Sequence, residues 1–73
     1  MQITNLHDLQ HCVRYTITPW HNADKWWFDG MFIDHYVDER FPVTVAVFIN
    51  SNHDTYFVNQ LELSSATIMI NIM

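Results

Sequence analysis

The sequence predicts a small α+β domain in which one main helix packs on a mostly antiparallel sheet of four to five strands. Three observations predict this fold. The chain has 73 residues, which suits a single compact domain over residues 1–73. Hydrophobic residues make up 49% of it, with one glycine and two prolines, and this excludes a disordered tail or linker. Several segments alternate apolar and polar residues, as half-buried strands do.

The N-terminal part is predicted to contain a short helical segment followed by a strand. Residues 6–12 are predicted to form one or two helical turns, capped by Thr4 or Asn5. Residues 12–18 then alternate, and they predict a strand with one apolar face made of Val13, Tyr15 and Ile17.

Residues 19–29 allow two interpretations. In the first they form the main helix, because Thr18 suits the N-cap, Pro19 the first helical position and Gly30 the residue after the end. One apolar stripe would then face the sheet, made of Trp20, Ala23, Trp27 and Phe28. In the second, Asp29-Gly30 closes a hairpin between residues 25–28 and 31–34, and the domain is an all-β meander. We favour the helix, because three end signals agree with the stripe.

Four further strands are predicted, over residues 31–37, 43–49, 55–63 and 66–72. The strand over 43–49 is apolar on both faces and is therefore expected in the middle of the sheet. In the strand over 31–37, Phe32 and Tyr36 are expected on one face with Asp34. In the strand over 55–63, the core side is expected to hold Phe57, Leu61 and Leu63.

The last strand has no charge and no proline, so as an exposed edge it would promote aggregation. It must lie centrally, be covered, or pair with a second copy of the chain. A homodimer is therefore possible, with self-association through Ile68, Ile70 and Ile72.

The charge excludes some classes of partner. Eight acidic residues face three basic ones, Arg14, Lys25 and Arg40, and the formal net charge is −5. Three scattered cations cannot form the basic face that binds nucleic acid or anionic lipid, so we expect no direct nucleic-acid partner and no membrane partner. An acidic surface fits docking on a basic surface of another protein.

Acidic and aromatic residues gather between Trp20 and Glu39. Some of the rings must fill the core, but exposed tryptophans and tyrosines among carboxylates are typical of interface anchors. The predicted partner-binding residues are Trp20, Asp24, Trp26, Asp29, Asp34, Tyr36, Asp38 and Glu39.

Metal binding and catalysis have weaker support in the sequence. His7 and His11 are four residues apart, beside Asp8 and Cys12, and these residue types ligate zinc. A structural zinc site usually needs cysteine pairs, and this chain has one cysteine. Its one glycine cannot form a phosphate-binding loop. We therefore expect no metal, no cofactor, no catalytic residues and no enzymatic activity.

The location follows from two further observations. No apolar run approaches the roughly 20 residues that a membrane span needs. The first residues lack the basic and apolar regions of a signal peptide, so we expect a cytoplasmic protein.

Together these observations predict a non-catalytic protein-binding module whose acidic, aromatic face docks on a basic surface of a larger protein. In size and charge the chain is similar to inhibitors encoded by phages and mobile elements. That similarity implies an anti-defence role, in which the module occupies a nucleic-acid-binding surface of a host protein or complex. The alternative is a homo-oligomerising structural or assembly protein with no foreign partner.

Overall fold

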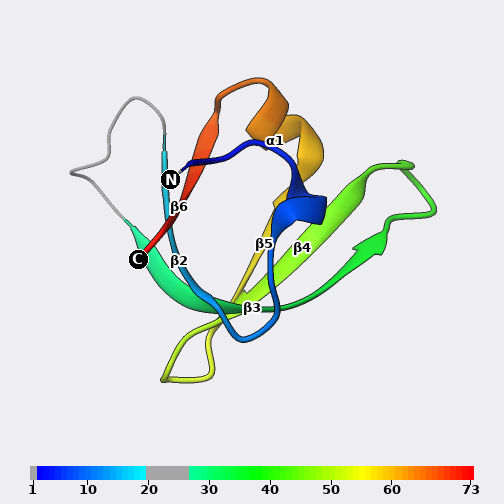
Figure 1. Ribbon diagram of the computed structural model, residues 1–73. Helices are drawn as coiled ribbons and strands as arrows, with labels where there is room; N and C mark the ends of the chain where they lie inside the picture. The colour runs from blue at the N-terminus through cyan, green and yellow to red at the C-terminus, as the bar shows by residue number, and fades with distance from the viewer. Residues whose placement is uncertain (1, 20–26) are drawn as a thin grey trace.

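Six antiparallel strands form one sheet in the computed structural model, which describes residues 2–19 and 27–73 (Figure 1). The sheet order is β1-β6-β2-β3-β4-β5. The strands are β1 (Gln2–Ile3), β2 (Arg14–Pro19), β3 (Phe28–Val37), β4 (Thr44–Ile49), β5 (Thr55–Asn59) and β6 (Ile68–Ile72). Two short helices accompany them, the 3-10 turn η1 (Leu6–Asp8) and the α-helix α1 (Gln60–Ser64).

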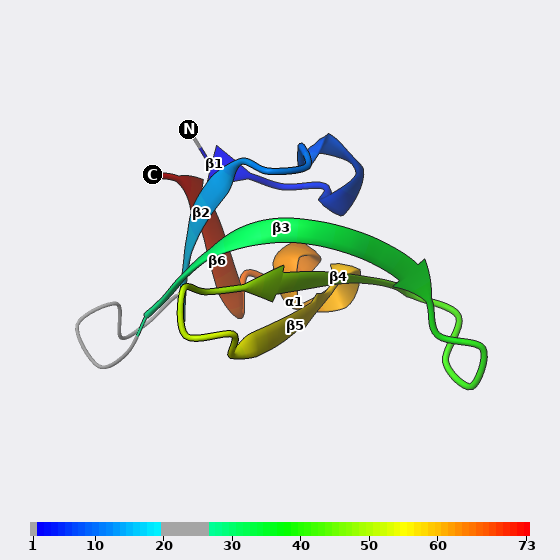
Figure 2. The ribbon, with the colours of Figure 1, turned by 90° about the horizontal axis from the view of Figure 1, so that it is seen from below.

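The sheet curves around a single core. In Figure 2, β3 is a long arc with β1 and β2 on one side and β4 and β5 on the other. We call the face that carries the buried side chains the inner face, and the opposite face the outer face. Tyr15, Phe32 and Phe48 are the largest fully buried side chains of this core. Their rings pack against one another, with centroids 5.8 Å apart for Phe32 and Phe48 and 6.1 Å apart for Tyr15 and Phe48.

A bulge in β3 changes which residues face the core. Phe32 pairs with Phe48, but the next pair is Asp34 with Val47, so Ile33 is an extra residue. The alternation therefore reverses after the bulge, and Asp34 and Tyr36 lie on the outer face, opposite to Phe32. The sequence-based assignment of Phe32 to the same face as Asp34 and Tyr36 was wrong for this reason.

The helix α1 replaces the second half of the strand predicted over residues 55–63. Asn59 caps it with a complete capping box: its side chain accepts from the N–H of Glu62, and the Glu62 carboxylate accepts from the N–H of Asn59. The predicted core side was also partly wrong. Leu63 is buried, but Leu61 and Phe57 are exposed, and Val58 fills the core instead.

The main helix was predicted over residues 19–29, but both ends of that segment belong to strands. Pro19 belongs to β2, and Phe28 and Asp29 belong to β3, while residues 20–26 lie outside the described part. The alternative turn at Asp29-Gly30 is also wrong, because Gly30 sits inside β3 opposite Tyr15. The domain is small and compact and consists mostly of sheet, which fits the all-β alternative better than a fold with a main helix.

The remaining elements follow the predicted order. The 3-10 turn η1 begins after Asn5, whose side chain accepts from the N–H of His7. The strand β4 pairs on both sides, with β3 and β5, as its two apolar faces predicted. In the described ranges 2–19 and 27–73, no helix is long and apolar enough to cross a membrane.

The strand β6 lies inside the sheet, between β1 and β2. Ile68 and Ile70 are buried in the core, and Ile72 is exposed at the end of the strand. The sequence analysis required this uncharged strand to lie centrally, to be covered or to pair with a second copy, and the structure places it centrally. β2 pairs with β6 along its whole length on one side, and β1 pairs with Ile70 and Asn71 on the other. Self-association through the three isoleucines remains a prediction.

Candidate functional site

The outer face of the sheet holds the predicted binding residues that the structure places together. Asp34 pairs with Val47, and Val47 pairs with Phe57, so these side chains form one row across β3, β4 and β5. Tyr36 pairs with Val45 in the next row of the same face. Val47 alternates with the core residues Ala46 and Phe48, which fixes the row on the side away from the core.

Large apolar side chains stand exposed on this face. Tyr36 keeps 49% of its surface accessible, and Phe57 keeps 55%. Ile33, placed by the bulge, is also exposed beside them. Half-exposed aromatic side chains with fixed strand positions lose little conformational freedom on binding, and such residues are common in interface hot spots.

Carboxylates lie among these apolar groups. The side chain of Asp34 is 76% exposed, and its Oδ1 accepts the N–H of His35 at 2.8 Å. The imidazole of His35 lies 4.0 Å from the same oxygen. The carboxylate thus has a fixed position and still faces solvent.

The acidic groups continue into the turn after β3. Asp38 Oδ1 accepts the N–H of Arg40 at 3.0 Å, and the Arg40 guanidinium lies 4.0 Å away and is 94% exposed. Glu39 is exposed between them. We name Ile33, Asp34, Tyr36, Asp38 and Glu39 the acidic β3 face. It carries three carboxylates and, nearby, the guanidinium of Arg40.

The structure separates Asp29 from the acidic β3 face. Asp29 lies on the outer face near the start of β3 and accepts a hydrogen bond from the Thr16 hydroxyl at 2.8 Å. Asp29 and Asp34 are five positions apart along β3, with four residues between them, a span of about 17 Å. The other predicted anchors, Trp20, Asp24 and Trp26, lie outside the described residues.

The sequence analysis assigned two exposed aromatic residues, Trp27 and Phe57, to the core. Trp27 was assigned to the core-facing stripe of a helix, but 61% of it is exposed just before β3 begins. Phe57 was assigned to the core side. It is followed by Val58, which is also apolar, so only the pairing of β5 with β4 determines which of the two faces outward.

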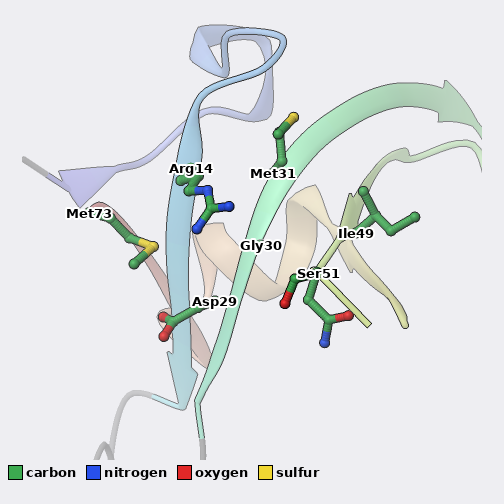
Figure 3. A pocket seen from close by; sticks show the side chains of 8 residues that line it. Arg14, Asp29, Gly30, Met31, Ile49, Ser51 and Met73 are labelled. Atoms are coloured by element: carbon green, nitrogen blue, oxygen red, sulfur yellow. The ribbon is translucent and has the colours of Figure 1, made fainter. Parts of the chain in front are cut away.

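A small cavity of about 230 Å³ lies at the other end of the outer face (Figure 3). Arg14 from β2 and Asp29 from β3 line it, and Ser51 comes from the turn after β4. Its remaining lining residues are Gly30, Met31, Ile49, Asn50 and Met73. Typical small-molecule sites enclose about 300–1,000 Å³. No histidine or cysteine occurs among the described lining residues.

His7 and His11, the residues considered in the sequence analysis as zinc ligands, do not converge on Cys12. The His7 ring meets the edge of the His35 ring, with centroids 5.1 Å apart, and His11 packs on Phe32 at 5.0 Å. Cys12 is exposed, with a positive φ of 66° in the turn before β2. No group of three His, Cys, Asp or Glu side chains in the described segments could hold a metal ion.

No family model matches this chain, and neither a curated protein nor a solved structure matches it.

Proposed function

We propose that the chain is a non-catalytic protein-binding module that docks through the acidic β3 face on a basic surface of a larger protein. One observation carries the proposal. Tyr36 and Asp34 stand side by side along β3 on the outer face, both exposed, and one offers an apolar anchor while the other offers a charge. A nucleic-acid-binding surface on the partner would provide the matching cations, as expected for an inhibitor of the phage or mobile-element type.

The charges specify how such binding depends on salt. Exposed carboxylates at the rim of an interface mainly accelerate association, and added salt screens them. The apolar contacts of Tyr36 and Ile33 do not depend on salt in this way. A partner of the proposed kind therefore binds more weakly at high salt and competes with a polyanion such as heparin.

Capture experiments with matched variants test the proposal. The test variant reverses two charges, Asp34→Lys with Glu39→Lys. Glu39 is chosen over Asp38 because the Asp38 carboxylate accepts the N–H of Arg40 and holds the turn. The control variant makes the same total charge change at exposed residues elsewhere, Asp8→Lys with Gln10→Lys and Asn52→Lys.

The expected result is a salt-sensitive partner that the native chain and the control variant capture and that the test variant loses. Tyr36→Ala should weaken the same capture, and heparin should displace the partner. Capture that survives the Asp34→Lys and Glu39→Lys changes, or that the control variant loses equally, would contradict docking through the acidic β3 face.

A further inference from the structure

Among the described residues β1 and β5 are the two edge strands of the sheet, and β5 pairs there with β4 alone. The N–H of Asn50 donates to the carbonyl of Asp54 at 3.0 Å, so these two residues form a hydrogen-bonded pair at the start of the ladder. Such pairs alternate along an antiparallel ladder. Tyr56 and Val58 therefore direct their backbone groups toward β4. Thr55 and Phe57 direct theirs away from the sheet.

The end of β5 is already occupied. The N–H of Asn59 donates to the Glu62 carboxylate at 3.1 Å, and Asn59 is the N-cap of α1. For Thr55 and Phe57, the described residues show no backbone hydrogen bond to any segment outside the ladder with β4. The outward N–H and C=O groups of these two residues are thus the ones that another strand can use.

This edge lacks the features that usually prevent pairing. The strand has the sequence Thr-Tyr-Phe-Val-Asn, with no charge and no proline, and its register with β4 is regular. Natural edge strands usually carry a lysine, a proline or a bulge, or are covered. Phe57 adds a side chain that is 55% exposed at this edge.

We propose that β5 pairs with β5 of a second copy of the chain, antiparallel, around a two-fold axis at Tyr56. This register places Thr55 of each copy opposite Phe57 of the other. Both residues face outward, so the two pairs form four backbone hydrogen bonds. A register centred on Phe57 would instead require the backbone of Asn59, which the helix cap uses.

The side chains of the strand suit this self-pairing. On the outer face, each Phe57 lies opposite a Thr55 of the other copy. An aromatic residue opposite a β-branched residue is a favourable cross-strand pair. No charged residue of either strand opposes a like charge. An isologous contact of this kind uses one patch twice, and two-fold pairing is the commonest assembly of identical chains, so the occupant proposed for this edge is a second copy.

The charges beside the edge give the dimer a salt dependence. Asp54 precedes β5 and Glu62 follows it in α1, so antiparallel pairing brings the carboxylates of the two copies toward each other. Salt screens this repulsion and should tighten the dimer. Docking through the acidic β3 face should weaken with salt, whereas the dimer should tighten. The two proposals therefore predict opposite responses to salt, and each can be contradicted without the other.

The first test measures mass in solution against concentration. The native chain is expected to pass from 8.7 kDa to twice that mass as its concentration rises, and at lower concentration in high salt. Phe57→Lys should raise the dissociation constant at least about tenfold. The matched control is Thr67→Lys, an exposed position in the turn before β6, which should leave the dimer unchanged.

A synthetic chain with N-methyl Phe57 isolates the backbone contribution. Its N–H faces away from β4, so the fold is expected to remain, while two of the four intermolecular bonds are lost. Hydrogen exchange locates the contact. The amides of Thr55 and Phe57 should slow with concentration, and those of Tyr56 and Val58 should be slow throughout.

Three outcomes would overturn the proposal. The first is a chain that stays monomeric over the whole range of concentration and salt. The second is a dimer that survives both Phe57→Lys and N-methylation. The third is concentration-dependent protection elsewhere without protection of Thr55 and Phe57, which would place the interface on another surface.

Discussion

The side-chain amide of Gln60 accepts the backbone N–H of Leu6 through Oε1, at 2.9 Å and across 54 residues of sequence. Its Nε2 donates to the carbonyl of Thr4 and to the hydroxyl of Ser64, each at 3.1 Å. Gln60 begins α1 directly after β5, Thr4 directly follows β1, and Leu6 begins η1. The strands β1 and β5 are the two edges of the sheet. One side chain thus links two edges that no ladder joins.

We expect Gln60→Ala to lower the free energy of unfolding by about 2–3 kcal/mol, because it removes these bonds and leaves the N–H of Leu6 without its partner. Urea denaturation measures the change. Gln10→Ala is the control, since Gln10 is exposed and bonds to Tyr15 through its backbone N–H. That control should shift stability by no more than about 0.5 kcal/mol. Equal effects of the two substitutions would contradict the linking role.

Three turns of the described chain place ordinary residues in the left-handed region, where glycine fits better, and two of them are at His53 and Ala66. His53 has a φ of 66° as the last residue of the β4–β5 turn, and its N–H donates to the carbonyl of Asn50. Ala66 has a φ of 58° after α1, where the N–H of Thr67 reaches the carbonyl of Glu62. This second arrangement is a Schellman motif, whose left-handed residue is most often glycine.

His53→Gly and Ala66→Gly should each raise the free energy of unfolding by about 0.5–1 kcal/mol. The left-handed conformation costs an ordinary residue roughly 1–2 kcal/mol, and the extra freedom of glycine in the unfolded chain offsets part of this gain. Ser65→Gly is the control, because Ser65 has a φ of −86° and gains no relief from strain. Thermal unfolding measures the stability of the three variants, and His53→Gly and Ala66→Gly should both be more stable than Ser65→Gly. A loss of stability in His53→Gly or Ala66→Gly would contradict the prediction.

The sequence predicted strands well where alternation alone defines them. It failed where the register with a neighbouring strand decides the outcome. The bulge at Ile33 is an example, because nothing in the local sequence of β3 shows that Ile33 has no partner in β4. The exposure of Phe57 is another, because it adjoins Val58 and both are apolar.

One missed element did have a local signal. Asn59 and Glu62 have the three-residue separation of a capping box, and α1 begins between them. The apolar residues beyond it, Leu61 and Leu63, are two apart and supported a strand instead. At the candidate site, Asp34 and Tyr36 share the outer face because they are two residues apart on the same side of the bulge, as the sequence indicated.

Gly30 is required where β3 passes under the ring of Phe28. A Cβ at this position would lie 2.5 Å from Cε1 of Phe28 and 3.1 Å from the carbonyl oxygen of Ile49. The Phe28 ring is stacked on Tyr56, with centroids 5.4 Å apart, so it cannot move without losing that contact.

Gly30→Ala should therefore lower the free energy of unfolding by about 1–3 kcal/mol, as overpacking does in other cores. Combining it with Phe28→Leu tests the cause, because the smaller side chain makes room for the new methyl group. The double variant should be more stable than the sum of the two single changes predicts. Strict additivity in urea denaturation would show that the Phe28 ring is not the obstacle.

Tyr56 gives the domain an alkaline limit to its stability. Burial, and secondly the nearby Glu62 carboxylate, raise the pKa of Tyr56 above its ordinary value of 10.0. The folded state thus holds the phenol proton more tightly than the unfolded state does. The associated stability is complete below the unfolded pKa and is lost as pH rises through the folded pKa.

We compare the free energy of unfolding of the native chain with that of Tyr56→Phe. The value for the native chain minus that for the variant should stay constant up to about pH 10 and fall at higher pH. Urea denaturation from about pH 8 to about pH 12 measures this difference. Glu62→Gln keeps the side-chain oxygen that accepts the Asn59 N–H but removes the charge. It should therefore narrow the pH range over which Tyr56 loses its contribution to stability. A difference that stays flat across the whole range would show that folding does not perturb Tyr56.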